Sequence, residues 1–227
     1  MKKLLFALFL SPLMVFAQTT PKGFVINGKL DGFQEGLEIR LVQNGESVEM
    51  TSTTLKQGKF TLKGSVKEPV LCFLMIGGEK PVELYVENKV ISFKGDKAEP
   101  GKYKVEGSAA HKDFTEFLTV FLPHAQQLSS QAGIINYTMP GPAKDSLMTV
   151  YTATQQKLQA EIDNLVAKKP TSVIVPFVLN VTYQFNDDVM LLEKRYDQMD
   201  AIAKNTEAGK QLKDFITQNK IGAIGTD

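Results

Sequence analysis

The strongest constraint on the fold is a change in hydrophobic periodicity near residue 108. Before this point, short segments of alternating apolar and polar residues are separated by Gly, Asn, Asp and Pro. After it, apolar residues recur at helical spacing and turn-forming residues become sparse. A period of two is typical of strands and a period of 3.6 is typical of helices. The sequence therefore predicts an α+β fold with a β part followed by an all-helical part.

The N-terminal part contains about eight short segments that have strand character, spaced roughly 8–12 residues apart. They lie at residues 24–30, 37–43, 47–54, 59–64, 70–76, 82–86, 91–94 and 103–106. Turns such as Asn44-Gly45 and Gln57-Gly58 separate them and supply residues that tolerate positive φ. Evenly spaced short strands favour a small antiparallel β-sandwich or barrel, which we expect to span residues 22–107.

The C-terminal part, residues 109–221, is expected to be helical. An amphipathic stripe at positions i, i+3, i+4, i+7 and i+8 opens it: Phe114, Phe117, Leu118, Phe121 and Leu122. Pro123 follows directly and is expected to kink or end this first helix. Asp145 or Ser146 is the expected cap of a second helix, and Asp187 or Asp188 that of a later one.

Two further segments complete the helical part. Residues 173–185 alternate like a strand near their end, but they begin like a helix, with Ser172 before an apolar run and an early Pro176. We interpret this segment as a buried helix because helical patterns flank it on both sides. A last helix is predicted over residues 206–219.

The first residues match the pattern of an export signal. Lys2 and Lys3 precede an apolar run that extends to Ala17, with Val15 at the −3 position of the expected cleavage site. This pattern predicts a cleavable signal peptide over residues 1–17. The run is shorter than the roughly 20 apolar residues of a membrane-spanning helix, and no longer one follows. Since no cysteine follows directly to carry a lipid, we expect an exported, periplasmic protein that is not a lipoprotein.

Composition argues against several kinds of chemistry. The 26 Lys and Arg residues balance 25 Asp and Glu residues without a basic run, so nucleic acid is not an expected partner. Cys72, the only cysteine, lies in an apolar run and is expected to be buried and unreactive. His111 and His124 are too few for a zinc site and have no partners in a recognisable triad. We predict no catalytic residue, metal or cofactor, and expect that the chain is not an enzyme.

The most unusual segment is 133–142, where apolar and aromatic residues occur among Gly and Pro. The sequence predicts a loop here, either packed against the helices or serving as a binding lip. The candidate contact residues are Ile134, Ile135, Asn136, Tyr137 and Met139.

Several motifs occur in an order that resembles one family. They are FVINGKL at 24–30, GKFTLKG at 58–64, TSVIVPFVL at 171–179 and TEAGKQL at 206–212. Together they resemble the N-terminal domain of unknown function that precedes thioredoxin-like modules in exported thiol-disulfide oxidoreductases of Gram-negative bacteria. In that family the last helix leads through a short link into a redox domain with a C-x-x-C motif. Residues 222–227 resemble the start of that link, and we expect them to be a truncated linker.

The resemblance implies a role without redox chemistry, because the chain has one cysteine and no C-x-x-C motif. The implied function is that of a non-catalytic accessory or binding protein of this lineage. It would hold a protein or peptide partner through the β domain or the groove between the domains. A stand-alone periplasmic ligand-binding or structural envelope protein is the alternative, and a hydrolase using dispersed carboxylates is a third hypothesis.

Overall fold

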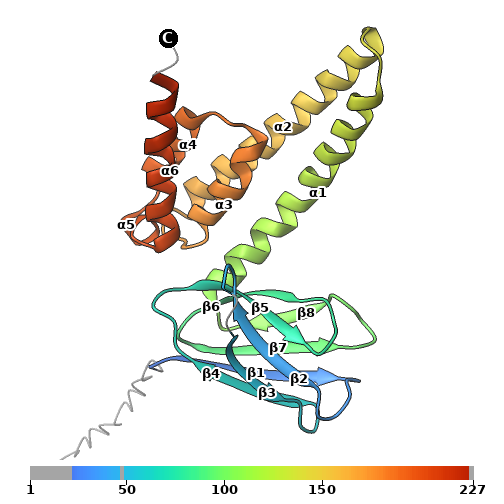
Figure 1. Ribbon diagram of the computed structural model, residues 1–227, viewed down its shortest axis with the longest axis vertical. Helices are drawn as coiled ribbons and strands as arrows, with labels where there is room; N and C mark the ends of the chain where they lie inside the picture. Colours follow the sequence, from blue (N-terminus) through green and yellow to red (C-terminus); the bar gives the residue numbers. More distant parts are fainter. Residues whose placement is uncertain (1–21, 47–48, 225–227) are drawn as a thin grey trace, which may run out of the picture.

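The computed structural model describes residues 22–46 and 49–224, which form a β-sandwich followed by a helical domain (Figure 1). The predicted signal peptide, residues 1–17, lies outside the described residues. Residues 225–227 of the predicted truncated linker also lie outside them, whereas residues 222–224 belong to the last helix, which is described as far as Ile224. The predicted α+β layout, with strands first and helices second, is confirmed.

The sandwich consists of eight strands in two four-stranded sheets. They are β1 Phe24–Asp31, β2 Glu38–Gln43, β3 Glu49–Thr54, β4 Lys59–Gly64, β5 Val70–Ile76, β6 Val82–Val86, β7 Val90–Asp96 and β8 Tyr103–Glu106. The strand orders are β4-β1-β7-β8 and β3-β2-β5-β6. Alternation places Ile39, Leu41, Phe60 and Leu62 between the sheets, where all four are buried. These side chains form the core between the two sheets, whereas the opposite faces of β2 and β4 carry mostly polar residues.

One strand pair departs from the predicted antiparallel arrangement. β1 pairs with β7 in parallel, from Val25 opposite Val90 to Asp31 opposite Asp96, whereas every other ladder among the described residues is antiparallel. Between these two strands the chain forms β2 and β3 in the second sheet, β4 on the other side of β1, and β5 and β6 in the second sheet, before β7 returns beside β1 in the same direction. Alternation within a strand reports which face is buried and carries no information about the direction of its neighbour.

The helical domain begins with a long hairpin that projects away from the sandwich (Figure 1). Its elements are α1 Ala109–Tyr137, α2 Pro142–Lys168, α3 Val175–Thr182, the 3₁₀ turn η1 Tyr183–Phe185, α4 Val189–Gln198, α5 Ala201–Lys204 and α6 Glu207–Ile224. The helical interpretation of residues 173–185 is confirmed. Asp188 caps α4 as predicted, its side chain accepting from the backbone N–H groups of Met190 and Leu191.

The first helix does not end at Pro123, and the predicted loop at 133–142 is wrong over residues 133–137, whereas 138–141 do form the turn before α2. α1 passes through Pro123 and Gly133 and ends only at Tyr137. A glycine costs a helix only about 1 kcal/mol, and packing of α1 along α2 outweighs that cost. The second helix also begins before the predicted caps, at Pro142, because proline suits the first helical position.

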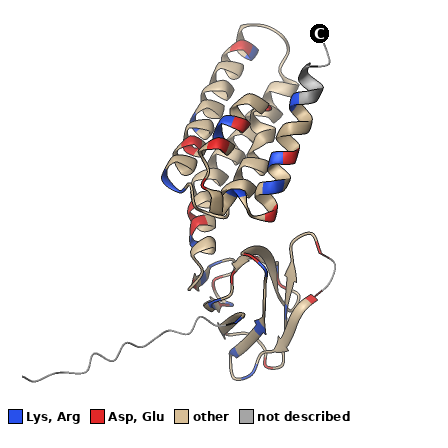
Figure 2. Ribbon diagram, turned by 90° about the vertical axis from the view of Figure 1, so that its left-hand side faces the viewer, with Lys and Arg blue, Asp and Glu red and all other residues tan. Residues whose placement is uncertain are grey.

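Acidic and basic side chains are interspersed over both parts of the molecule (Figure 2). Within the part of the chain that the structure describes, no helix combines the length and apolar character needed to cross a bilayer.

The packing of β1 against β4 yields a test of the sandwich core. Gly28 lies opposite Phe60, and a Cβ at Gly28 would meet the Phe60 ring at 1.9 Å. The ring is buried beside Phe93, so it cannot move without disturbing the core. We expect Gly28→Ala to lower the free energy of unfolding by about 1–3 kcal/mol, measured by urea denaturation.

A glycine in the helical hairpin serves as the control. A Cβ at Gly133 meets no atom within 4 Å, and the residue lies within α1. Gly133→Ala should therefore raise stability by about 0.5–1 kcal/mol. Equal effects of the two substitutions would contradict the described packing.

Candidate functional site

The two parts of the molecule meet in an apolar joint on the outer face of the β5–β6 sheet. The ring of Tyr85, on β6, lies 5.2 Å from that of Phe114 on α1, and Phe177 on α3 packs against both. Leu71, Ala110, Phe117, Ile174 and Val178 complete this buried cluster. Burial, reinforced by the negative charge of Glu83, raises the pKa of Tyr85 well above its usual value. The joint fixes α1 beside the edge of β6.

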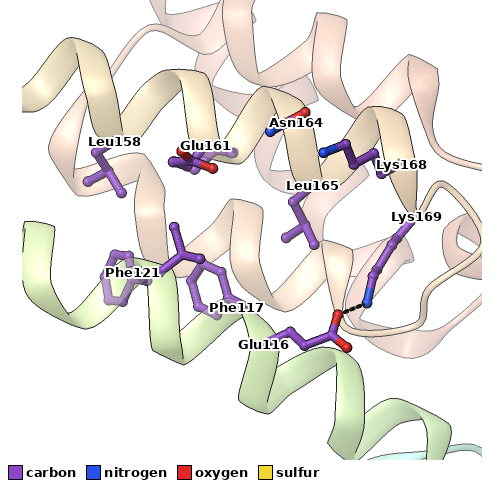
Figure 3. Close-up of a pocket in the computed structure, with 11 residues that line it drawn as sticks. Glu116, Phe117, Phe121, Leu158, Glu161, Asn164, Leu165, Lys168 and Lys169 are labelled. Carbon is purple, nitrogen blue, oxygen red and sulfur yellow. Dashed lines mark hydrogen bonds and ion pairs between the residues drawn. The ribbon is translucent and has the colours of Figure 1, made fainter.

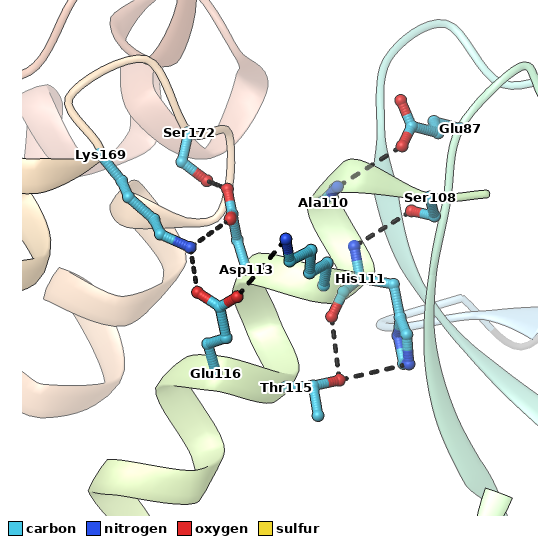
Figure 4. A network of polar contacts seen from close by, with 10 residues as sticks. Glu87, Ser108, Ala110, His111, Asp113, Thr115, Glu116, Lys169 and Ser172 are labelled. Atoms are coloured by element: carbon cyan, nitrogen blue, oxygen red, sulfur yellow. Dashed lines mark hydrogen bonds and ion pairs between the residues drawn. The ribbon is translucent and has the colours of Figure 1, made fainter. Parts of the chain in front are cut away.

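The first turn of α1 is anchored to the sandwich by side-chain oxygens (Figure 4). Ser108 caps the helix by accepting from His111 N–H at 3.0 Å, and Glu87 accepts from Ala109 N–H at 2.6 Å. Burial acts to raise the pKa of Glu87, but hydrogen bonds from Lys89, Ser108 and the helix N-terminus outweigh it and hold the pKa below its usual value. A carboxylate at this end of a helix also interacts favourably with the helix dipole.

His111 completes the anchoring of α1 and blocks part of the β6 edge. Its Nδ1 accepts from Tyr85 N–H at 3.4 Å, and its Nε2 lies 3.4 Å from Thr115 Oγ1. A neutral ring with its hydrogen on Nε2 satisfies both contacts. Burial lowers the pKa of His111, which favours that neutral form. The sequence predicted no site role for His111, so its contact with β6 is a finding of the structure.

A second polar cluster holds α1 to the connection between α2 and α3 (Figure 4). Lys169 Nζ donates to Asp113 at 2.5 Å and also to Glu116, while Ser172 Oγ donates to Asp113. Partial burial acts to lower the pKa of Lys169, but the two carboxylates outweigh it and raise that pKa. This cluster therefore serves to orient the helix, with its charges already paired.

A groove of about 740 Å³ lies beside the joint, where the sandwich meets α1. Residues from the outer face of β5, the β5–β6 turn, β6, the β7–β8 turn, β8 and α1 line it: Phe73, Glu79, Lys80, Pro81, Val82, Glu83, Pro100, Gly101, Tyr103, Val105, His111, Phe114, Thr115 and Leu118. β6 and β8 each end a sheet, so both present one edge that has no strand partner in the part of the chain that the structure describes. The groove is within the size range of ligand pockets.

The edge of β6 contributes backbone hydrogen-bonding groups to this groove. Tyr85 N–H points away from β5, since its acceptor is His111 on α1. Backbone groups alternate in direction along a strand. The N–H and C=O of Glu83, two residues earlier and opposite Phe73, therefore point to the same free edge. In the described residues they have no strand partner.

The groove also carries charge that is not neutralised locally. Glu79, Lys80 and Glu83 line it, and none of them forms an ion pair within the described ranges 22–46 and 49–224. Burial, with the negative charge of Glu79 as the second cause, raises the pKa of Tyr103. Apolar walls with a few polar groups are the usual composition of a binding site.

A smaller cleft of about 220 Å³ lies between α1 and α2 (Figure 3). Its apolar surface comes from Phe117, Phe121, Leu158, Ile162 and Leu165, and the Glu116–Lys169 ion pair lies at one end. Three further polar side chains, Glu161, Asn164 and Lys168, also line it.

The predicted contact residues lie elsewhere, at the far end of the hairpin. Ile134, Ile135, Asn136 and Tyr137 form the last turn of α1, and Met139 lies in the following turn. Tyr137 is 93% exposed and Met139 is 82% exposed, whereas Ile135 is buried. The structure brings these residues together at the hairpin tip, away from the groove. Their role in binding stays a prediction.

The remaining residues considered in the sequence as possible reactive or metal-binding groups are Cys72, His111 and His124. Cys72 is buried, and burial raises its pKa to about 12, so its thiol is not poised as a nucleophile. His111 and His124 are about 20 Å apart along α1, at 1.5 Å per residue. Within the part that the structure describes, no group of three or more His, Cys, Asp or Glu residues could hold a metal ion.

Comparison with known proteins identifies one domain. The family profile described as a domain of unknown function (DUF4369) matches residues 24–114. No curated protein matches the chain, and no solved structure matches it. The matched range continues past β8 through His111 and Phe114, so it contains the Tyr85–Phe114 pair of the apolar joint but not its α3 residues.

The position of His111 predicts how stability depends on pH. Its folded-state pKa is lowered from 6.5, so between that lowered value and 6.5 the unfolded chain binds a proton that the folded chain does not. Stability should be fully retained above 6.5 and fall as the pH drops through this window. We expect His111→Asn, whose amide oxygen can accept from Tyr85 N–H without titrating, to flatten this part of the curve.

The measurement is the unfolding temperature of both proteins by calorimetry between about pH 7 and about pH 5, the range in which histidine titrates. Loss of carboxylate interactions such as those of Glu87 occurs at lower pH, since its pKa lies below 4.5. Identical curves for the two proteins in the upper window would show that His111 does not control this response.

Proposed function

We propose that this protein is a non-catalytic accessory protein of the exported thioredoxin-related lineage, and that it binds a segment of a protein partner. The observation that carries the proposal is the groove beside the joint, where an unpaired strand edge meets apolar walls and unpaired charges. The lineage is proposed from the order of the sequence motifs, and the domain match adds that residues 24–114 form a domain of unknown function. An exported, periplasmic location forms part of the proposal and rests on the predicted signal peptide.

The groove is suited to holding a polypeptide and not to transforming it. A protein segment offers backbone donors and acceptors, which complement the free groups of Glu83. Its apolar side chains would contact Phe73, Tyr103 and Leu118. Among the described residues that line the groove, His111 is the only histidine, and both of its ring nitrogens are engaged. A general base needs a free ring nitrogen within reach of its substrate.

A stand-alone ligand-binding or structural protein is the alternative function. The cleft between α1 and α2 favours this alternative because it is apolar, with charged side chains at its rim. A ligand in that cleft would contact Phe121 and Leu165 and would not approach β6. The two functions are therefore separable by substitutions along α1.

Peptide selection with two matched variants tests the proposal. Thr115 lines the groove, whereas Thr119, one turn later on α1, lines neither the groove nor the cleft between α1 and α2. Both threonine hydroxyls bond to the carbonyl four residues earlier, and Thr115 additionally contacts His111 Nε2. A random heptapeptide library displayed on phage would be selected on the immobilised chain, and bound peptides measured by calorimetric titration.

We expect selected peptides to bind Thr119→Trp as they bind the unchanged chain. Thr115→Trp should weaken them at least about tenfold, because an indole would occupy space that the peptide fills and tenfold corresponds to about 1.4 kcal/mol. A folded chain that enriches no peptide, or peptides that ignore Thr115→Trp, would overturn the proposal. Circular dichroism of each variant establishes that the helices are intact.

A further inference from the structure

We propose that the bound segment is an extended strand that pairs antiparallel with β6 at Glu83 and carries a basic side chain opposite it. This inference rests on the proposed function and specifies its mode of binding. It follows from three features of the groove: an edge that is open over a short, defined stretch, walls of different character on its two sides, and carboxylates without partners.

The open stretch of the β6 edge is bounded on both sides. Toward the C-terminal end of β6, His111 occupies the Tyr85 N–H, so no strand can pair there. Toward the N-terminal end, Pro81 has no N–H to offer. Edge strands in soluble proteins are usually blocked in such ways against unwanted pairing. Between the two blocks, Glu83 offers one N–H and one C=O in the direction of the groove.

The geometry of pairing determines what the visiting strand needs. A residue opposite Glu83 in an antiparallel pair exchanges both backbone hydrogen bonds with it. Its side chain then lies on the same side as that of Glu83, because directly opposite residues share a face. Its two neighbours point to the other side, toward Val82 on β6 and the inward-facing Tyr103 and Val105 of β8.

The charges of the groove select the side chain at the central position. Glu83 is exposed and forms no ion pair among the described residues, and Glu79 lies in the preceding turn. Among the described residues, Lys80 is the one cation that lines the groove, so the carboxylates of Glu79 and Glu83 outnumber it there. A lysine or arginine opposite Glu83 gains an opposite-charge cross-strand pair, whereas a glutamate would meet a like charge. The flanking positions favour β-branched apolar residues such as valine.

The probe is a fluorescent five-residue peptide with the order Thr-Val-Lys-Val-Thr, acetylated and amidated at its ends. Its central lysine is designed to lie opposite Glu83, and its valines to face the sandwich. Affinity is measured by anisotropy on the full chain, with Thr115→Trp and Thr119→Trp as the blocked and control variants. Two further peptides each carry a methyl group on one backbone nitrogen, that of the lysine in one peptide and that of the second valine in the other.

Strand pairing predicts an alternating response. Methylation at the lysine should weaken binding about fivefold or more, since it removes a backbone hydrogen bond of about 0.5–1.5 kcal/mol and adds a clash. Methylation at the valine, whose N–H points away from β6, should change affinity less than about twofold. Glu83→Gln should weaken the lysine peptide and abolish its advantage over a peptide with glutamate at the centre.

The other outcomes overturn the inference and separate it from the proposed function. Equal effects of the two methyl groups would show that the groove does not bind its segment as a paired strand, and an unchanged affinity in Glu83→Gln would overturn the basic residue opposite it. If library peptides bind in the groove but this probe does not, the strand mode fails and the proposed function stands. If neither the probe nor any library peptide binds the folded chain, both fail.

Discussion

Contact between Tyr85 and Phe114 is the interaction on which the rest of the molecule depends. β6 buries side chains on both of its faces, with Leu84 and Val86 inside the sandwich and Tyr85 against the helices. Aromatic pairs of this kind add about 0.5–1.5 kcal/mol to the effect of their buried area. Because the pair lies at the start of α1, it sets the direction of the whole helical hairpin.

The polar contacts around this pair hold the first two turns of the same helix, α1, in position. Glu87 and Ser108 hold the first turn of α1 to the sandwich, and the cluster around Asp113 holds its second turn to the α2–α3 connection. Asp113 and Lys169 are only partly exposed. Removal of one partner from such a partly buried pair leaves an uncompensated charge, which is more costly than loss of a surface pair. The groove beside α1 therefore has walls that are held in place before any partner arrives.

Local pattern predicted the elements well where packing and pattern agree. The alternation of Ile39 and Leu41 identified a sandwich strand, and the cap at Asp188 identified the start of α4. Pattern failed at Gly133, where turn-forming residues lie in a helix stabilised by its neighbour α2. It also gave no sign of the parallel pairing of β1 with β7, because partner direction is a property of the whole chain path.

The groove itself could not be predicted from spacing. It combines residues from β5, β6, β8 and α1, which are far apart in the sequence. His111 was recognisable only as a histidine near a helix start, and its contact with Tyr85 appears once β6 and α1 are side by side. Glu83 looked like an ordinary exposed strand residue, and its free backbone groups become meaningful through their place at a sheet edge.

Deuterium exchange of the Glu83 backbone amide, followed by NMR, tests the central claim most directly. In the free protein this amide should exchange quickly, while that of Leu84, which points toward β5 in the ladder, exchanges slowly. Saturation with a groove-binding peptide should slow exchange at Glu83 and leave Tyr85, already bonded to His111, nearly unchanged. Unaltered exchange at Glu83 in the saturated complex would contradict the account, because the open edge of β6 would then not be where the partner binds.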